Sequence, residues 1–141
     1  MAPDAFLRYY ISMLLPITAT VAATLTFLYL GLSGQVIRGR ILGRGPEIGS
    51  GDEEDEFFRA VRAHANFIEY TPLFLILLGL LELADAPSLF MSLLGGSFII
   101  GRLSHWYGLT TPSRVRFRTL GMVLTLSQLF AAAALLLTRV F

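Results

Sequence analysis

The 141-residue sequence contains no cysteine and no lysine. Without cysteine, the chain has no disulfide framework, no thiolate ligand for a metal and no nucleophilic thiol of its own. The sequence also lacks the ligand spacing of a zinc site, a phosphate-binding glycine loop and the serine elbow of hydrolases. Any catalysis must therefore use a bound small molecule together with arginines, or else carboxylates and histidine.

Charged residues are also scarce: they make up 15% of the chain, whereas 55% of its residues are hydrophobic and the mean hydropathy is +0.67. A soluble domain of this length could not bury so much apolar surface, so the composition predicts an all-α integral membrane protein. Because about 20 helical residues cross a bilayer, we expect a single domain, residues 1–141, with four membrane-spanning helices. The expected spans are 11–32, 57–83, 88–108 and a helix that includes 119–138.

The first expected span contains Pro16, which should kink it. The N-terminus lacks a basic n-region and the apolar run is too long for a signal peptide, so we expect a retained anchor. A long glycine-rich loop, 34–55, should follow, with its acidic run at 52–56 capping the second helix.

The eleven arginines are distributed unevenly along the chain. Nine lie in or beside the connections between the first and second spans and between the third and fourth: Arg38, Arg40, Arg44, Arg59, Arg62, Arg102, Arg114, Arg116 and Arg118. The remaining two, Arg8 and Arg139, lie toward the other side. The positive-inside rule therefore predicts that both connections are cytoplasmic and that both termini are outside.

One face of the second expected helix is polar where it enters the membrane. Arg59, Arg62, Asn66 and Glu69 fall within about a quarter of the helix circumference, and His64 lies on another side. Snorkelling to lipid headgroups would explain the two arginines but not the deeper asparagine and glutamate. Charged groups at membrane depth are expensive, so this face is a candidate functional site.

The third expected helix has two distinct faces. Ser97, Gly101, Ser104 and Gly108 form a narrow stripe of small residues, which predicts close packing against another helix. Beside this stripe lie Arg102 and His105. A buried arginine in a membrane helix needs a partner, and we expect Glu69 to be that partner. His105 is a proton handler, an anion-binding donor or an interfacial residue, and the sequence leaves these three alternatives open.

Three arginines open the fourth expected helix. Arg114 and Arg118 share a face with Gly121 and Thr125, whereas Arg116 points roughly the opposite way. We expect one of the three to be functional and the others to bind phospholipid headgroups, and helical geometry favours Arg118.

The helix ends on the predicted cytoplasmic side should bring together Arg38, Arg62, Arg102 and Arg118 with Asn66 and Glu69. Guanidinium groups bind carboxylates in a bidentate manner, and a glutamate among them can hold an ammonium group or the arginines themselves. The expected ligand is therefore a small molecule with at least two carboxylates and one amine, which enters from the cytosol.

At these residues the chain resembles the MAPEG family, the membrane-associated proteins in eicosanoid and glutathione metabolism. The second-helix pattern Arg-x-x-x-Asn-x-x-Glu is present as Arg62, Asn66 and Glu69, followed by Tyr70 and Pro72. The third-helix pattern of an arginine and a histidine three residues later is similar to Arg102 and His105. The segment GRLSHWYGL, and then GMVLT after an arginine, look like the bacterial branch, which implies a multi-pass protein of the bacterial inner membrane.

The resemblance implies a four-helix bundle that assembles as a homotrimer and binds glutathione, as co-substrate, between neighbouring subunits on the cytoplasmic side. By the family's pattern, glutathione contacts Arg62, Asn66 and Glu69 of the second helix and Arg38 at the end of the first. Further candidates for this contact are Tyr70, Arg102, His105 and Arg114. A fourth-helix arginine would stabilise the thiolate. The resemblance does not decide between Arg116 and Arg118 for this catalytic role. The face that Arg118 shares with Gly121 and Thr125 favours Arg118.

The chain departs from the family at Leu109, where several animal members carry a tyrosine, and Tyr107 lies on a different face. The expected activity is that of a glutathione transferase or peroxidase acting on a lipophilic electrophile or lipid hydroperoxide that arrives from the bilayer. Two alternatives are a non-catalytic lipid- or thiol-binding membrane protein and a small multidrug transporter. The expected partners are other copies of the chain, membrane lipids and a lipophilic substrate, with no nucleic acid and no metal.

Overall fold

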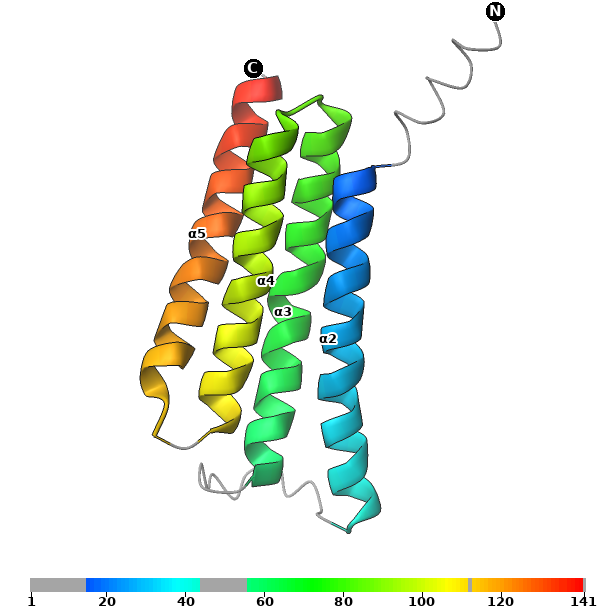
Figure 1. Cartoon of the computed structure of the whole chain (residues 1–141), viewed down its shortest axis with the longest axis vertical. Coiled ribbons are helices and arrows are strands. Elements are labelled where there is room, and N and C mark those ends of the chain that lie inside the picture. Colours follow the sequence, from blue (N-terminus) through cyan, green and yellow to red (C-terminus); the bar gives the residue numbers. More distant parts are fainter. Residues whose placement is uncertain (1–14, 44–55, 112, 141) are drawn as a thin grey trace, which may run out of the picture.

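The computed structural model describes residues 15–43, 56–111 and 113–140. These residues form four helices: α2 (Pro16–Ile41), α3 (Glu56–Leu83), α4 (Ser88–Thr110) and α5 (Val115–Val140). They lie side by side in an elongated bundle, and successive helices run in opposite directions (Figure 1). The all-α prediction is confirmed, since the described residues contain no strand. By length and composition, α2, α3 and α5 can each cross a membrane.

Three of the predicted spans agree closely with α3, α4 and α5, but the first is wrong at its C-terminal end. The helix α2 continues to Ile41, so Gly34 and Gly39 are helical and the predicted loop at 34–55 is shorter than expected. At Gly39 the missing side chain makes room for the ring of Phe57, which packs directly against the helix. Tertiary packing thus overrides the low helix propensity of glycine.

The predicted kink at Pro16 is also wrong. Pro16 is the first residue of α2. At this position a backbone N–H would have no partner within the helix, so proline costs no hydrogen bond. Residues 11–14, the start of the predicted span, and the acidic run at 52–55 lie outside the described residues. Glu56, the last residue of that run, is in the first turn of α3, where its charge suits the helix dipole.

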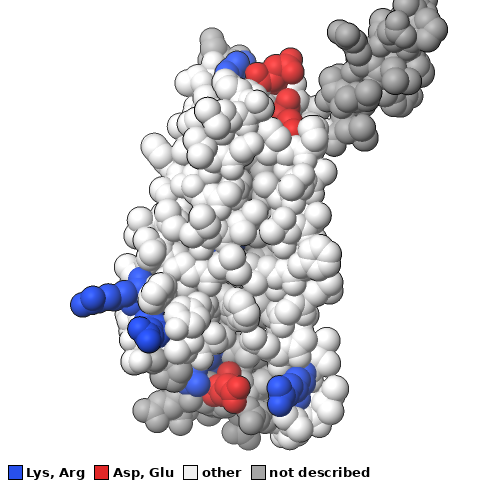
Figure 2. Space-filling view, viewed as in Figure 1, with Lys and Arg blue, Asp and Glu red and all other residues white. Residues whose placement is uncertain are grey.

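The interior of the bundle is packed with apolar side chains from all four helices. Its centre is formed by the rings of Phe74 and Phe98, which are fully buried and stacked with their centroids 3.8 Å apart. Many large apolar side chains, such as Phe27 and Phe130, are instead exposed on the outside. Figure 2 shows charged groups gathered toward the two ends, with a broad uncharged band between them. Such a surface suits a lipid environment.

The small residues of α4 pack against α5, as the stripe predicts. A Cβ atom on Gly101 would lie 3.0 Å from Cβ of Leu124, and one on Gly108 would collide with the backbone of Arg118. Gly121 of α5 contributes in the same way, because a Cβ atom there would collide with the backbone of His105. The close approach brings the first turn of α5 directly beside the last turns of α4.

The two ends of the bundle differ in charge. The arginine-rich end contains the described residues Arg38, Arg40, Arg59, Arg62, Arg114, Arg116 and Arg118. The opposite end carries Glu82 and Arg139. There the carboxylate of Glu82 accepts hydrogen bonds from the backbone amides of Ile17 (2.8 Å) and Thr18 (2.7 Å). It therefore caps the N-terminus of α2 and ties this helix to the end of α3.

Candidate functional site

A groove of about 380 Å³ opens at the arginine-rich end, between the first turns of α3, the last turn of α4 and the start of α5. We call it the arginine groove. Four arginines line it: Arg59, Arg62, Arg114 and Arg118. Its apolar lining comes from Phe58, Leu109 and Val115. The groove therefore combines positive charge with apolar surface, which suits a ligand that has both anionic and lipophilic parts.

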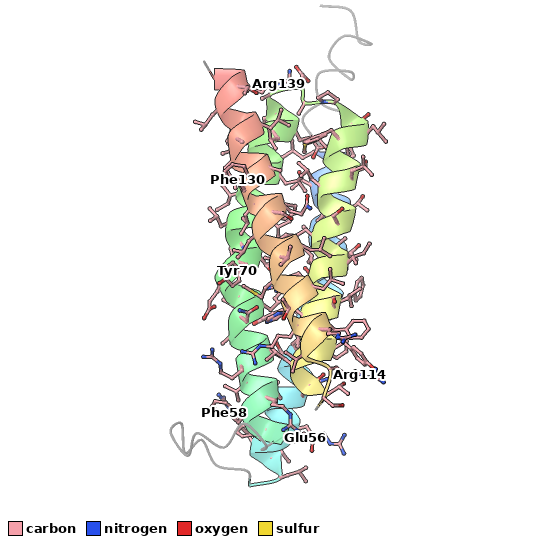
Figure 3. All side chains as sticks on the ribbon, turned by 90° about the vertical axis from the view of Figure 1, so that its left-hand side faces the viewer. Glu56, Phe58, Tyr70, Arg114, Phe130 and Arg139 are labelled. Carbon is pink, nitrogen blue, oxygen red and sulfur yellow. The ribbon has the colours of Figure 1, made fainter. Side chains whose placement is uncertain are left out.

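Three of the predicted site residues, Arg62, Arg114 and Arg118, meet in this groove. The side chains of all three are exposed, so they are open to a ligand. Arg114 immediately precedes α5, and Arg118 lies on its first turn. Figure 3 shows Arg114 at this end of the bundle and Tyr70 nearer the middle, along α3.

Arg102 of α4 lies deeper, inside the bundle, with only 2% of its surface exposed. Its Nη1 donates to the side-chain oxygen of Asn66 (3.1 Å) and to the backbone oxygen of the same residue (3.2 Å). The rings of Tyr70 and Phe98 flank the guanidinium, with their centroids 5.6 and 5.9 Å from Cζ. Nε and Nη2 are buried without a hydrogen-bond partner among the described residues.

The prediction that Glu69 pairs with Arg102 is wrong, because Asn66 accepts the hydrogen bonds. At about 100° per residue, Glu69 lies about 60° around α3 from Asn66. Its side chain is exposed, and it acts on Arg102 only through longer-range electrostatic attraction. The residues of the motif therefore face two ways: Asn66 faces the bundle interior, whereas Arg62 and Glu69 form an outward stripe.

His105 is 5% exposed and lies in the α4–α5 contact, so the interfacial interpretation is wrong. Its Nδ1 is 3.0 Å from the backbone oxygen of Arg118. A carbonyl oxygen can only accept, so Nδ1 must carry the proton and donate. The other histidine, His64, faces α2 instead: its Nε2 is 3.2 Å from Oγ of Ser33, and its ring packs on Tyr29.

The other seven predicted site residues are absent from the described lining of the arginine groove: Arg38, Asn66, Glu69, Tyr70, Arg102, His105 and Arg116. Arg38, in the last turn of α2, lines a separate groove of about 260 Å³ together with Gln35 and Glu56. Arg116 is exposed and is absent from the described lining of both grooves. Within one chain, the predicted convergence of Arg38 on Arg62 and Arg118 therefore does not occur.

Arg59, Phe58 and Thr111 also line the arginine groove, although none of the three was predicted to bind the ligand. The sequence did indicate Arg59, because this residue shares the polar face of the second expected helix with Arg62. No pattern marked Phe58 or Thr111, since their place depends on how the ends of α3 and α4 meet.

Comparison with known proteins agrees with the helical membrane fold. The model of the MAPEG family matches residues 18–138. The inner membrane protein YecN of Escherichia coli K12 is 30% identical over 93 residues, which cover 65% of this chain and 69% of YecN. YecN of Escherichia coli O6:H1 matches with the same values. The chain is thus a membrane protein that belongs to the MAPEG family.

Proposed function

We propose that the protein is a glutathione-dependent membrane enzyme of the transferase or peroxidase type. In this proposal Arg118 stabilises the thiolate of glutathione for attack on a lipophilic electrophile or hydroperoxide. The observation that carries the proposal is the arginine groove, in which Arg62, Arg114 and Arg118 approach one another beside apolar side chains.

The charges of the groove match those of glutathione, which has two carboxylates, one ammonium group and a thiol. Four arginines and no carboxylate are found among its described lining residues. Arg62 and Arg114 are suited to hold the two carboxylates, because each guanidinium can form a bidentate pair. Glu69, two turns from Arg62 on the same stripe, is exposed and suited to the ammonium group.

Arg118 then remains for the sulfur. Glutathione supplies the nucleophile, and a thiol with a pKa of about 8.5 is mostly protonated at neutral pH. A guanidinium within hydrogen-bond reach favours the anionic form, which is the reactive one. We therefore assign the catalytic role to Arg118 and not to Arg116, which lies outside the groove.

The lipophilic substrate is proposed to enter from the bilayer, along the apolar side of the groove formed by Phe58, Leu109 and Val115. The excess of arginine at this end supports a cytoplasmic orientation in a bacterial inner membrane, with both termini outside. A homotrimer would allow Arg38 of one subunit to complete the groove of the next, since Arg38 lies apart from that groove in its own chain.

One observation supports a second candidate, a non-catalytic thiol- or lipid-binding protein. Leu109 lines the groove at the position where several animal members carry a tyrosine, so one polar contact to the ligand is lost. The transporter alternative is weaker, because a site for drug cations needs a carboxylate and none is found among the described lining residues of this groove.

The test is a titration of the purified protein with glutathione while the ultraviolet absorption of the thiolate is recorded. We expect a saturable thiolate band in the wild type and in Arg116→Ala, but not in Arg118→Ala. Saturable binding without the band would favour the binding protein. No binding at millimolar glutathione would refute the proposal and leave another thiol or a lipid as the ligand.

A further inference from the structure

The last turns of α4 make two hydrogen bonds to consecutive carbonyl groups in the first turn of α5. Oγ of Ser104 donates to the backbone oxygen of Phe117 (3.0 Å), and Nδ1 of His105 lies 3.0 Å from that of Arg118. We call these two side chains the α4 clamp. Within a helix, each of these carbonyl oxygens already accepts a hydrogen bond from the N–H group four residues later. The clamp therefore uses the second lone pair of each oxygen.

Close backbone packing supports the clamp from both sides. Gly108 of α4 lies against the backbone of Phe117 and Arg118, and Gly121 of α5 lies against the backbone of His105. The backbone of Arg118 is therefore fixed, whereas its side chain is exposed and lines the arginine groove. A long, flexible side chain can place its guanidinium accurately only if its Cα is held in position.

We propose that His105 is the positioning residue for Arg118, which it holds through the backbone so that the guanidinium meets the sulfur of glutathione. This role rests on the proposed function of Arg118. His105 itself does not touch the ligand in this proposal. Its role is to donate Nδ1–H to the backbone carbonyl of Arg118. Ser104 assists by donating to the carbonyl of the preceding residue, Phe117.

The alternative is that His105 merely joins two membrane helices, as polar side chains often do. The chain contains a matched comparison, because its only other histidine, His64, also makes an interhelical contact, to Ser33 of α2. His64 lines neither groove among the described lining residues. If His105 acted only by adding general stability to the bundle, loss of either histidine should have a similar effect on the thiolate.

The experiment compares His105→Leu, His105→Asn and His64→Leu in the thiolate titration at saturating glutathione. Asparagine places an N–H donor at the position of Nδ1, whereas leucine removes it. We expect His105→Leu to lower the thiolate fraction by roughly tenfold, the size of effect that follows when a charge-stabilising group is misplaced. His105→Asn and His64→Leu should stay within about twofold of the wild type.

A wild-type thiolate fraction in His105→Leu, or an equal loss in His64→Leu, would overturn the proposal. If the wild type itself shows no thiolate, the proposed function fails first, so the two failures can be told apart. A second measurement needs no folded variant of His105: ¹⁵N NMR of the wild type with labelled histidine, in which the His105 signals are assigned by comparison with His64→Leu. We expect a protonated Nδ1 at His105, and an unprotonated Nδ1 would contradict the clamp.

Discussion

Replacing Asn66 with leucine should destabilise the bundle more than replacing Arg102, the donor to which it is bound. Asn66→Leu removes the side-chain acceptor at 3.1 Å but leaves the backbone acceptor at 3.2 Å. A hydrogen bond to a charged group contributes about 1.5–3 kcal/mol. Because one of two acceptors remains, we expect the free energy of unfolding to fall by about 1.5 kcal/mol.

Arg102→Met should lower the free energy of unfolding less than Asn66→Leu does, because it leaves only the neutral oxygen of Asn66 without a partner. It removes a buried charge whose Nε and Nη2 have no partner among the described residues, and methionine fills much of the same space. Replacing all members of a buried polar cluster by apolar side chains of similar volume is often neutral or stabilising, because no desolvated group is then left without a partner. Adding Arg102→Met to Asn66→Leu should therefore restore the lost stability, since neither partner is then left alone.

The assay is thermal unfolding in one detergent, followed by circular dichroism, for the two single variants and the double variant. Ser92→Ala serves as the control, because this exposed hydroxyl bonds only to Ser88 of its own helix. The reasoning would be refuted by a double variant less stable than Asn66→Leu, since that order would mean that the charge of Arg102 stabilises the bundle without Asn66.

Two further predictions concern the packing and the far end of the bundle. Gly121→Ala would push a Cβ into the backbone of His105 and should cost about 1–3 kcal/mol; Gly31→Ala, with no atom within 4 Å of its Cβ, should stabilise α2 by up to about 1 kcal/mol. Thermal unfolding checks both, and equal effects would contradict the close contact of α4 and α5. Glu82→Ala should lower stability by about 1 kcal/mol and speed hydrogen exchange of the first amides of α2, which it caps. Unchanged exchange, with Asp85→Asn as the control, would show that water replaces the cap.

The membrane class, the helices and the packing stripe on α4 follow from local patterns in the sequence. Apolar runs of sufficient length predict the helices, and Gly101 and Gly108 at helical spacing predict close approach of another helix, which the structure shows to be α5. The end of α2 could not be predicted, because glycine at position 39 favours a loop by its local propensity. Only the packing of Phe57 against Gly39 in the folded bundle explains the helix there.

The candidate site was predictable only in part. Helical angles alone predict a polar face on α3 and favour Arg118 over Arg116, and the groove is lined by Arg62 and Arg118 but not by Arg116. Asn66 and Glu69 lie about 60° apart around α3. Which of them accepts a hydrogen bond from Arg102 depends on how α3 is rotated relative to α4, and the pattern of one helix does not show this. The separation of Arg38 from the groove likewise depends on how α2 packs on α3.

The proposed function requires that the arginine groove bind glutathione and that Arg118 stabilise its thiolate. The most direct measurement compares the affinity of the wild type and of Arg118→Ala for glutathione and for S-methylglutathione, which cannot ionise at sulfur. We expect the wild type to bind glutathione more tightly than the methylated form, and Arg118→Ala to bind both equally. Equal affinity of the wild type for the two ligands would contradict the proposed function.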